Sequence, residues 1–320
     1  MQRLTLAGGI PDSLRGAIVA LGNFDGFHLG HQAVVGRAIQ RGFHERRPVI
    51  VATFDPHPVR FFKPDVPPFR LTTLDQRERL FAHAGADAML VFEFDKALAV
   101  TSAEDFVADT LATQIGAVGV VTGDDFTFGR GRKGNVDTLR MLGQQSGIVA
   151  EAVAPVTIGD TRISSGRIRE ALEAGDTATA TKLMSRDFAI QGVVQDGDKR
   201  GRELGYPTAN LRLDPACGLE HGIYAVRVGV GERRYDGVAS FGRRPMFDQG
   251  TVLLEVFLFD FSGDLYGEVI DVAFIDWIRP ELKFDSVEDL VRRINEDARL
   301  ARAALAAAPD AFPKLGRIPG

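Results

Sequence analysis

Residues 17–32 read AIVALGNFDGFHLGHQ, and this stretch decides the fold of the N-terminal half. A short apolar run typical of a buried strand comes first, a glycine-containing turn follows, and helical spacing begins after the turn. Where such a turn enters a helix, backbone N–H groups are free to bind an anion, and Gly22 and Gly30 let the backbone approach it closely. The stretch therefore predicts a phosphate-binding strand-turn-helix unit, in which His28 and His31 could donate hydrogen bonds.

Two other interpretations of the histidine pair stay open from these residues alone. A structural metal site needs three or four ligands, and the rest of the chain offers only His44, His57, His83 and His221. The single cysteine, Cys217, excludes a cysteine zinc site and any disulfide within the chain. A purely structural turn is the other interpretation, because a pair of histidines in a turn is more often structural than catalytic. The glycine spacing and the strand-helix setting favour phosphate binding over both.

The first half of the chain alternates β-like apolar runs with segments of helical spacing. This alternation predicts a parallel sheet covered by helices on both faces, with ligands bound beyond the carboxyl ends of its strands. The histidine turn and the segment GDDFTFGRGRKG both occupy such positions. The expected strands are 17–22, 48–54, 87–94, 117–123 and 147–153, and the expected helices are 31–43, 72–84, 103–115 and 135–145.

From about Phe188 to Arg279 the pattern changes to closely spaced β-like runs without a good helix, which predicts a small barrel or sandwich. A closing helix follows, with Val287, Leu290 and Ile294 among the apolar residues on one face. We expect two domains, 1–184 and 185–308, and a flexible tail at 309–320.

Composition excludes some classes of function. The 320 residues include 38 basic and 43 acidic side chains, a net charge of -5, which argues against broad nucleic-acid binding. The N-terminus has no long apolar region typical of a signal peptide, and no apolar run approaches the roughly 18 residues of a membrane span. We therefore expect a cytoplasmic protein that binds neither nucleic acid nor membranes.

Two further segments of the first half contain candidate binding residues. In GDDFTFGRGRK, Asp125 is followed by Phe126 and Phe128, which could stack on an aromatic ligand, and by basic residues that could meet phosphate. The alternative is a solvated loop whose phenylalanines enter the core. In ISSGRIREAL, Ser164 and Ser165 could form an anion site at a helix start, and Ser165 is also a suitable N-cap.

The second half contains a glycine-rich segment, GVVQDGDKRGRELGYPTANL, at 192–211. Gly197, Gly201 and Gly205 could form a flap over phosphates. Thr208 and Asn210, two residues apart on an extended stretch, point to one face, and their neutral oxygens suit a Mg²⁺ ion that binds substrate phosphates. A β-hairpin with a polar edge explains these residues equally well.

Glu255 is the most unusual charged residue of the second half. It interrupts the apolar run TVLLEVFLF, where a buried carboxylate is costly without a partner. A carboxylate in such a strand could act as a general base for an attacking hydroxyl. The alternative is a strand residue that faces outward.

Taken together, these motifs resemble a known family. GNFDGFHLGH is similar to the GxFDGxHxGH signature of the nucleotidyltransferase superfamily, and ATFDPHP (52–58), TGDDFTFGRGRKGN (122–135) and ISSGRIREAL (163–172) follow in the order found in bacterial FAD synthetases. The resemblance implies a Rossmann-like domain in which an FMN phosphate oxygen attacks the α-phosphorus of ATP and expels pyrophosphate. It implies that His28 and His31 stabilise the triphosphate, with Arg169 on the leaving phosphates. It also implies that the nucleotide is bound by other residues of the turn, namely Gly22, Asn23, Phe24 and Gly30.

The second half resembles riboflavin kinases. GYPTANL is similar to their PTAN motif, which implies that Thr208 and Asn210 bind Mg²⁺ and ATP, and LLEVFLFDF matches the strand of the catalytic glutamate, here Glu255. The sequence departs from the family motifs at two places that concern substrate contacts. In the first half, Gly166 replaces the threonine of the SSTxxR motif of the FAD synthetases. In the second half, Met246 stands in a segment similar to GxANxGxRPTF, together with Ser240 and Arg243.

The resemblance covers residues 15–305 and implies a bifunctional riboflavin kinase and FMN adenylyltransferase, with ATP as co-substrate, Mg²⁺ as cofactor, and flavins as substrates and products. Two alternatives stay open: an enzyme with one activity only, or a flavin-binding regulatory protein without activity. The sequence predicts no oligomeric state.

Overall fold

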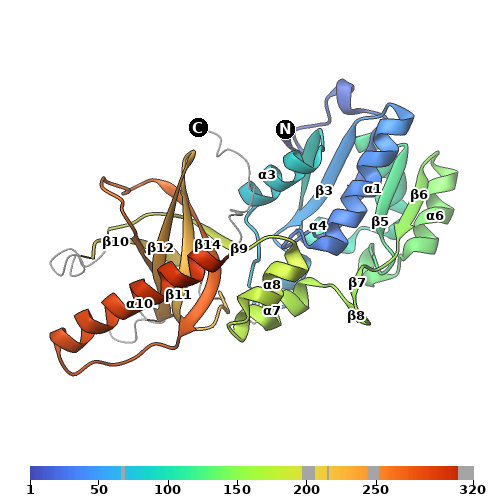
Figure 1. Ribbon diagram of the computed structural model, residues 1–320. Helices are drawn as coiled ribbons and strands as arrows, with labels where there is room; N and C mark the ends of the chain where they lie inside the picture. The colour runs from blue at the N-terminus through green and yellow to red at the C-terminus, as the bar shows by residue number, and fades with distance from the viewer. Residues whose placement is uncertain (66–68, 197–205, 215, 244–251, 309–320) are drawn as a thin grey trace. The chain divides into compact units, whose positions relative to one another are not determined.

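The computed structural model describes residues 1–65, 69–196, 206–214, 216–243 and 252–308, which divide into two compact units. The first contains the described residues of 1–68 and 74–164, and the second contains those of 69–73 and 165–320. Figure 1 shows the elements of both. No helix among the described residues is long and apolar enough to cross a membrane.

The first unit is built on a six-stranded sheet in the order β1-β4-β3-β2-β5-β6, and all its pairings are parallel. The order reverses at β2: the chain moves from β2 to β3 and β4 on one side, then returns to place β5 on the other. Such a reversal is the place where parallel α/β sheets bind ligands. The strands are β1 (Gln2–Thr5), β2 (Ile18–Leu21), β3 (Val49–Asp55), β4 (Ala88–Glu93), β5 (Gly119–Gly123) and β6 (Val149–Val153).

Of the strands predicted from apolar runs, β2 and β3 are buried as expected, whereas β6 has no fully buried residue. Every residue of β2 is buried, and β3 is buried except at Asp55, because helices cover both faces of a parallel sheet. The helical elements of this unit are η1 (Asp12–Leu14), α1 (Leu29–Glu45), α2 (Pro58–Phe62), α3 (Leu74–Ala84), α4 (Lys96–Val100), α5 (Ala103–Asp105), η2 (Phe106–Ile115), η3 (Arg130–Arg132) and α6 (Val136–Gln145). A hairpin of β7 (Thr157–Ile158) and β8 (Thr161–Arg162) ends the unit.

The helix predicted at 103–115 shows how local signals set its ends. Ser102 caps the start by accepting a hydrogen bond from the N–H of Asp105 at 3.0 Å, and Gly116 ends it in the left-handed conformation. Phe106 and Leu111 pack in the core. From Phe106 onward the segment is a π-helix, a departure from regular α-helix that the spacing did not predict.

The second unit begins with two helices, α7 (Ser165–Glu173) and α8 (Thr177–Met184), and continues as an antiparallel sheet. The sheet order is β10-β13-β12-β11-β14-β9. The N–H of Gln195, just after β9, donates to the carbonyl of Asn210 on β10 at 2.8 Å and so links the two ends of the sheet into a partly closed barrel. The strands are β9 (Phe188–Val193), β10 (Thr208–Leu213), β11 (Gly222–Val230), β12 (Arg233–Arg243), β13 (Val252–Leu258) and β14 (Val269–Arg279).

The closing helix α10 (Val287–Ala307) lies across β11, β12 and β14 (Figure 1). Its buried residues are Asp297, Ala301 and Leu305. Val287, expected on the apolar face, is 56% exposed, so the buried face begins about three turns further along the helix than the pattern suggested.

Candidate active sites

The histidine turn leaves the sheet at the strand where the order reverses. The Thr53 hydroxyl on β3 donates to the carbonyl of Asn23 at 2.7 Å, and the Thr122 hydroxyl on β5 donates to that of Leu21 at 2.9 Å. Both threonines are fully buried. The two neighbouring strands therefore fix the start of the turn through its backbone.

The turn itself is compact and strained. Phe24, Gly26 and Phe27 all have positive φ, at 50°, 84° and 38°. Such angles are unfavourable for phenylalanine, so the surroundings must hold the turn in place. Both phenylalanine side chains are buried and meet Phe81 of α3 edge to face, at centroid distances of 5.8 and 5.2 Å.

A buried ion pair holds the same turn in place, and no sequence pattern predicted it. Asp25 and Arg77 are each 2% exposed, and Nη2 of Arg77 lies 3.1 Å from Oδ1 of Asp25. Nη1 of Arg77 also donates to the Thr53 hydroxyl at 3.1 Å. One arginine on α3 therefore connects the turn to β3. An aspartate within FDG indicated a turn, but not the partner that lies far away in sequence.

His28 is the N-cap of α1. Its Nδ1 accepts a hydrogen bond from the backbone N–H of His31 at 3.3 Å. Neutral His28 therefore has its proton on Nε2, which makes that atom a donor. The two rings are stacked with centroids 3.6 Å apart, and a Cβ at Gly30 would come within 3.2 Å of Nδ1 of His28. Glycine at position 30 leaves room for the capping ring.

Two more predicted residues lie at the base of this turn. The Oδ1 atom of Asn23 is buried and has no hydrogen-bond partner among the described residues, which is costly unless a ligand supplies a donor. A Cβ at Gly22 would come within 3.0 Å of the Phe24 ring. One continuous cradle at the carboxyl end of β2 thus contains the predicted residues of this turn: Gly22, Asn23, Phe24, His28, Gly30 and His31.

The predicted residues after β5 separate into exposed and buried ones. Asp125 is exposed, and its Oδ2 lies 2.8 Å from Nη2 of Arg162, a residue that the sequence reading did not select. Phe128 is 7% exposed and packs on Phe106, with Phe126 stacked beside it at a centroid distance of 5.9 Å. Phe128 therefore lies in the core, and Phe126 covers it at the edge.

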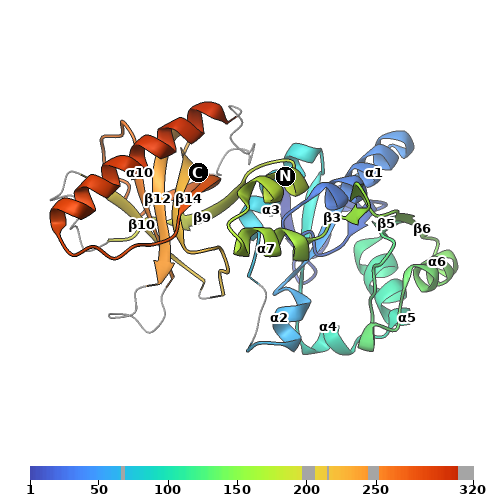
Figure 2. The ribbon, with the colours of Figure 1, turned by 60° about the horizontal axis from the view of Figure 1, so that its bottom comes forward.

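An aromatic cluster at the ends of β3 and β4 was also missed. Phe61 and Phe62 of α2 meet Phe94 edge to face, at 5.4 and 5.7 Å, and Phe62 is 61% exposed. Figure 2 shows helices α2 and α4, which follow these two strands. The signal was the FF pair just after ATFDPHP.

The serine segment lies where the two compact units divide. Helix α7 begins at Ser165, so its N-cap position falls on Ser164 and not, as predicted, on Ser165. One turn into this helix, Nε of Arg169 donates to the carbonyl of Phe69 at 2.7 Å, and its guanidinium lies 5.9 Å from the centre of the Phe69 ring.

In the second unit, strand register brings the remaining predicted residues together. Asn210 on β10 lies directly opposite Glu255 on β13, and Ser240 on β12 lies opposite Glu255 on the other side. Directly opposite residues share one face of a sheet, and Thr208, two residues before Asn210, lies on that face as well. Thr208, Asn210 and Glu255 therefore form one polar group on the barrel wall.

The same group fits a hard cation. Asn210 is 6% exposed, and its Oδ1 is buried without a hydrogen-bond partner in the described part of the chain, while its Nδ2 donates to the carbonyl of Thr208 at 3.1 Å. An unpaired amide oxygen is a suitable ligand for Mg²⁺. Gly197, Gly201, Gly205 and Met246 lie outside the described residues. Among the described residues, no group of three or more His, Cys, Asp or Glu side chains is arranged to hold a metal.

Comparison with known proteins matches both halves of the chain. The FAD synthetase family model matches residues 10–167, and the riboflavin kinase family model matches residues 184–305. A bifunctional riboflavin kinase/FMN adenylyltransferase of Escherichia coli (strain K12) is 38% identical over 288 residues, which cover 90% of this chain and 92% of the relative. The protein of the same name from Pseudomonas fluorescens is 39% identical over 298 residues, covering 93% and 95%.

One solved structure is similar over almost the whole chain. The crystal structure described as a macrolide-efflux protein from Streptococcus pneumoniae superposes with a TM-score of 0.80 at 32% identity. It covers 94% of this chain and 99% of that one.

Proposed function

The chain belongs to the family of bifunctional riboflavin kinase/FMN adenylyltransferases, and we propose that residues 1–184 adenylylate FMN while residues 185–308 phosphorylate riboflavin. The enzyme transfers the γ-phosphate of ATP to riboflavin, which gives FMN and ADP. It then transfers AMP from a second ATP to FMN, which gives FAD and pyrophosphate. The observation that supports two separate sites is that the histidine turn lies in the first compact unit, whereas Thr208, Asn210 and Glu255 lie together in the second.

For adenylylation, the proposed site is the cradle at the end of β2. An FMN phosphate oxygen attacks the α-phosphorus of ATP, and the Nε2–H of His28 donates to the triphosphate as negative charge moves toward the leaving pyrophosphate. His31 is the second proposed donor. Arg169, with Ser164 and Ser165 at the start of α7, binds the leaving phosphates. These roles require alignment and charge neutralisation rather than a covalent intermediate.

For the flavin ring, we propose contacts from aromatic side chains near the carboxyl ends of the strands. Phe126 presents its ring, and Phe128 supports it from the core. The exposed ring of Phe62 is a further contact. Asp125 lies in the same loop and, through Arg162, helps to hold it in place.

For phosphorylation, the proposed base is Glu255. Its carboxylate accepts the proton of the riboflavin 5′-hydroxyl while that oxygen attacks the γ-phosphorus of ATP. Thr208 and Asn210 would hold Mg²⁺, which when bound would supply charge neutralisation for the ATP phosphates. The unpaired Oδ1 of Asn210 supports this assignment. We propose that Gly197, Gly201 and Gly205, which lie outside the described residues, belong to the segment that contacts the ATP phosphates.

One incubation tests the proposal. Purified protein receives riboflavin, ATP and Mg²⁺, and the flavins are separated by chromatography. We expect FMN to appear first and FAD to follow. FMN without FAD would refute the adenylyltransferase assignment, and unchanged riboflavin would favour a flavin-binding regulatory protein. Because both reactions use ATP, we place the enzyme in the cytoplasm.

A further inference from the structure

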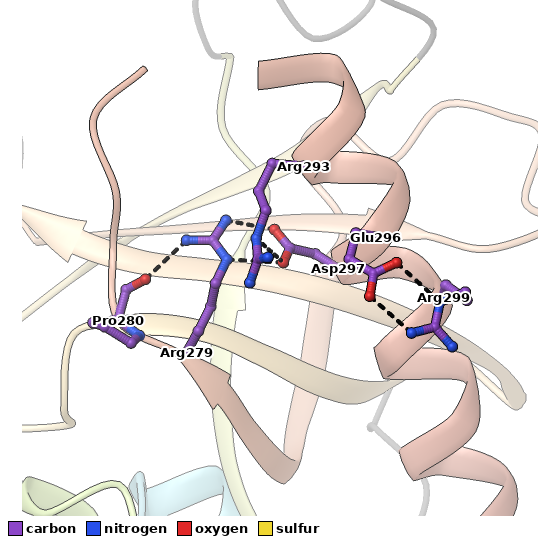
Figure 3. Close-up of polar contacts among 6 residues, drawn as sticks. All are labelled: Arg279, Pro280, Arg293, Glu296, Asp297 and Arg299. Carbon is purple, nitrogen blue, oxygen red and sulfur yellow. Dashed lines mark hydrogen bonds and ion pairs between the residues drawn. The ribbon is translucent and has the colours of Figure 1, made fainter. Parts of the chain in front are cut away.

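A buried arginine fixes the chain where it leaves the last strand of the barrel. Arg279, at the end of β14, donates from Nε and Nη2 to the two carboxylate oxygens of Asp297 on α10, at 2.8 and 2.5 Å. Its Nη1 donates to the carbonyl of Pro280 at 2.8 Å (Figure 3). Arg279 is 9% and Asp297 4% exposed, and Nε of Arg293 lies 3.2 Å from the same carboxylate. Such a bidentate ion pair fixes the relative position of the two side chains and also neutralises their charges.

The residue after Pro280 is Glu281. The space beside Gly242 shows where the Glu281 side chain lies. A Cβ built on Gly242 of β12 would overlap the Glu281 carboxylate, 2.6 Å from Cδ and 2.7 Å from Oε2. The carboxylate therefore occupies the space into which a side chain at position 242 would point. Only glycine leaves that space free.

Strand register shows that this is the face of Glu255. Ser240 lies directly opposite Glu255, and Gly242, two residues further along β12, points to the same face. Gly242 is thus a diagonal neighbour of Glu255, and such positions lie about 7–8 Å apart. One ligand can contact both carboxylates.

The charges around Glu281 agree with this position. Burial of part of the side chain raises its pKa, the His221 imidazole lowers it, the neighbouring Glu255 raises it and Arg279 lowers it, with a net upward shift. His221 immediately precedes β11, where Gly222 pairs with Phe241, so continuing the register brings His221 opposite Gly242. Glu281 remains exposed to solvent and is accessible to substrate.

We propose that Glu281 is a substrate-contacting residue of the kinase site, which hydrogen-bonds the ribityl hydroxyls of riboflavin beside Glu255. This inference rests on the proposed role of Glu255 as the base for the 5′-hydroxyl. That hydroxyl ends a run of hydroxyl-bearing carbons, so a carboxylate one diagonal position away meets the hydroxyls that precede it. A carboxylate is a strong acceptor for hydroxyl groups, whereas it would repel the ATP phosphates.

The test compares riboflavin with lumiflavin, which has the same ring system and a methyl group in place of the ribityl chain. Binding of each is measured by quenching of flavin fluorescence. For Glu281→Ala we expect about a tenfold loss of riboflavin affinity, the value of a hydrogen bond to a charged group, and a change of less than about twofold for lumiflavin. Glu281→Gln, which keeps neutral hydrogen bonds, should lose less.

Two matched variants separate contact from folding. Gly242→Ala keeps Glu281 but displaces its carboxylate, and should show the same selective loss of riboflavin. Glu296→Gln on α10 removes an exposed carboxylate paired with Arg299 and should leave both affinities unchanged. Adenylylation of supplied FMN serves as the control for intact protein.

Equal losses for both flavins, or no loss for riboflavin, would overturn the inference. Its failure is distinct from that of the proposed function. If wild-type protein phosphorylates riboflavin and Glu255→Gln does not, while Glu281→Ala binds riboflavin normally, only the role of Glu281 is refuted. If wild-type protein does not phosphorylate riboflavin, the kinase assignment is refuted, and the ratio of the two affinities still tests the contact with the ribityl chain.

Discussion

Replacing His28 by asparagine separates the two tasks that the structure gives this residue. Its Nδ1 caps α1 by accepting from the N–H of His31, and its Nε2 is the proposed donor to the triphosphate. Asparagine is among the best N-cap residues, so it can accept the same hydrogen bond. Its short amide does not extend to where Nε2 lies. His28→Asn thus keeps the cap and removes the donor, whereas His28→Ala removes both.

The two tasks have different magnitudes. Loss of an N-cap costs about 0.5–2 kcal/mol of the free energy of unfolding, so His28→Ala should be destabilised by that amount and His28→Asn hardly at all. Loss of one donor that is preorganised for a transition state costs about 3–4 kcal/mol, which corresponds to a 10²–10³-fold decrease in kcat. Both variants should therefore lose adenylylation to a similar extent while differing in stability.

The assay supplies FMN, ATP and Mg²⁺ and follows FAD by chromatography, with thermal unfolding measured in parallel. Phosphorylation of riboflavin by the same samples should continue, because Glu255 lies in the other unit. If His28→Asn makes FAD within about tenfold of the wild-type rate, His28 acts as a cap and not as a transition-state donor. If phosphorylation stops in a folded variant, the assignment of activities to the two domains is wrong.

Four further outcomes are expected. Glu255→Gln should stop riboflavin phosphorylation but still convert supplied FMN to FAD, as measured by chromatography. Asn210→Ala should raise the Mg²⁺ concentration needed for half-maximal kinase activity without changing that for adenylylation. Asp25→Ala leaves Arg77 buried without this counter-ion and should destabilise the first unit by about 3–5 kcal/mol, seen by calorimetry as a lower Tm for one of two transitions. Because the pKa of Glu281 is raised, the protonated carboxyl group binds its proton more tightly in the native state than in the unfolded chain. The free energy of unfolding should therefore fall as the pH rises above 4.5, the ordinary pKa of a glutamate. Denaturant titrations at several pH values should show this fall for the wild type and not for Glu281→Gln.

Sequence reasoning predicted what local pattern determines. The order of strand, turn and helix around His28 was recoverable because apolar runs, glycines and helical spacing are short-range signals. The spacing of Thr208 and Asn210 placed them on one face, and the structure adds that register brings Glu255 opposite Asn210. That pairing joins strands distant in sequence, so no local pattern contained it.

Two of the residues that the sequence pattern misjudged depend on partners far away in sequence. Apolar spacing put Val287 on the inner face of the closing helix, yet the structure buries Asp297 and exposes Val287. A hydrophobic pattern cannot anticipate this, because burial of a carboxylate becomes favourable only when Arg279 meets it with two hydrogen bonds. Likewise Asp25 reads as a polar turn residue until α3 supplies Arg77.

Both units therefore fix their proposed sites in the same way. Buried ion pairs add little net stability compared with well-packed apolar residues, but they hold backbone segments in one defined position. Asp25 and Arg77 fix the turn that leads to His28, and Asp297 and Arg279 fix the segment that presents Glu281. Phosphoryl and nucleotidyl transfer depend mainly on alignment, so a small misplacement of a donor lowers the rate strongly. The buried pairs are thus explained better by the precision that the two reactions require than by the stability of the fold.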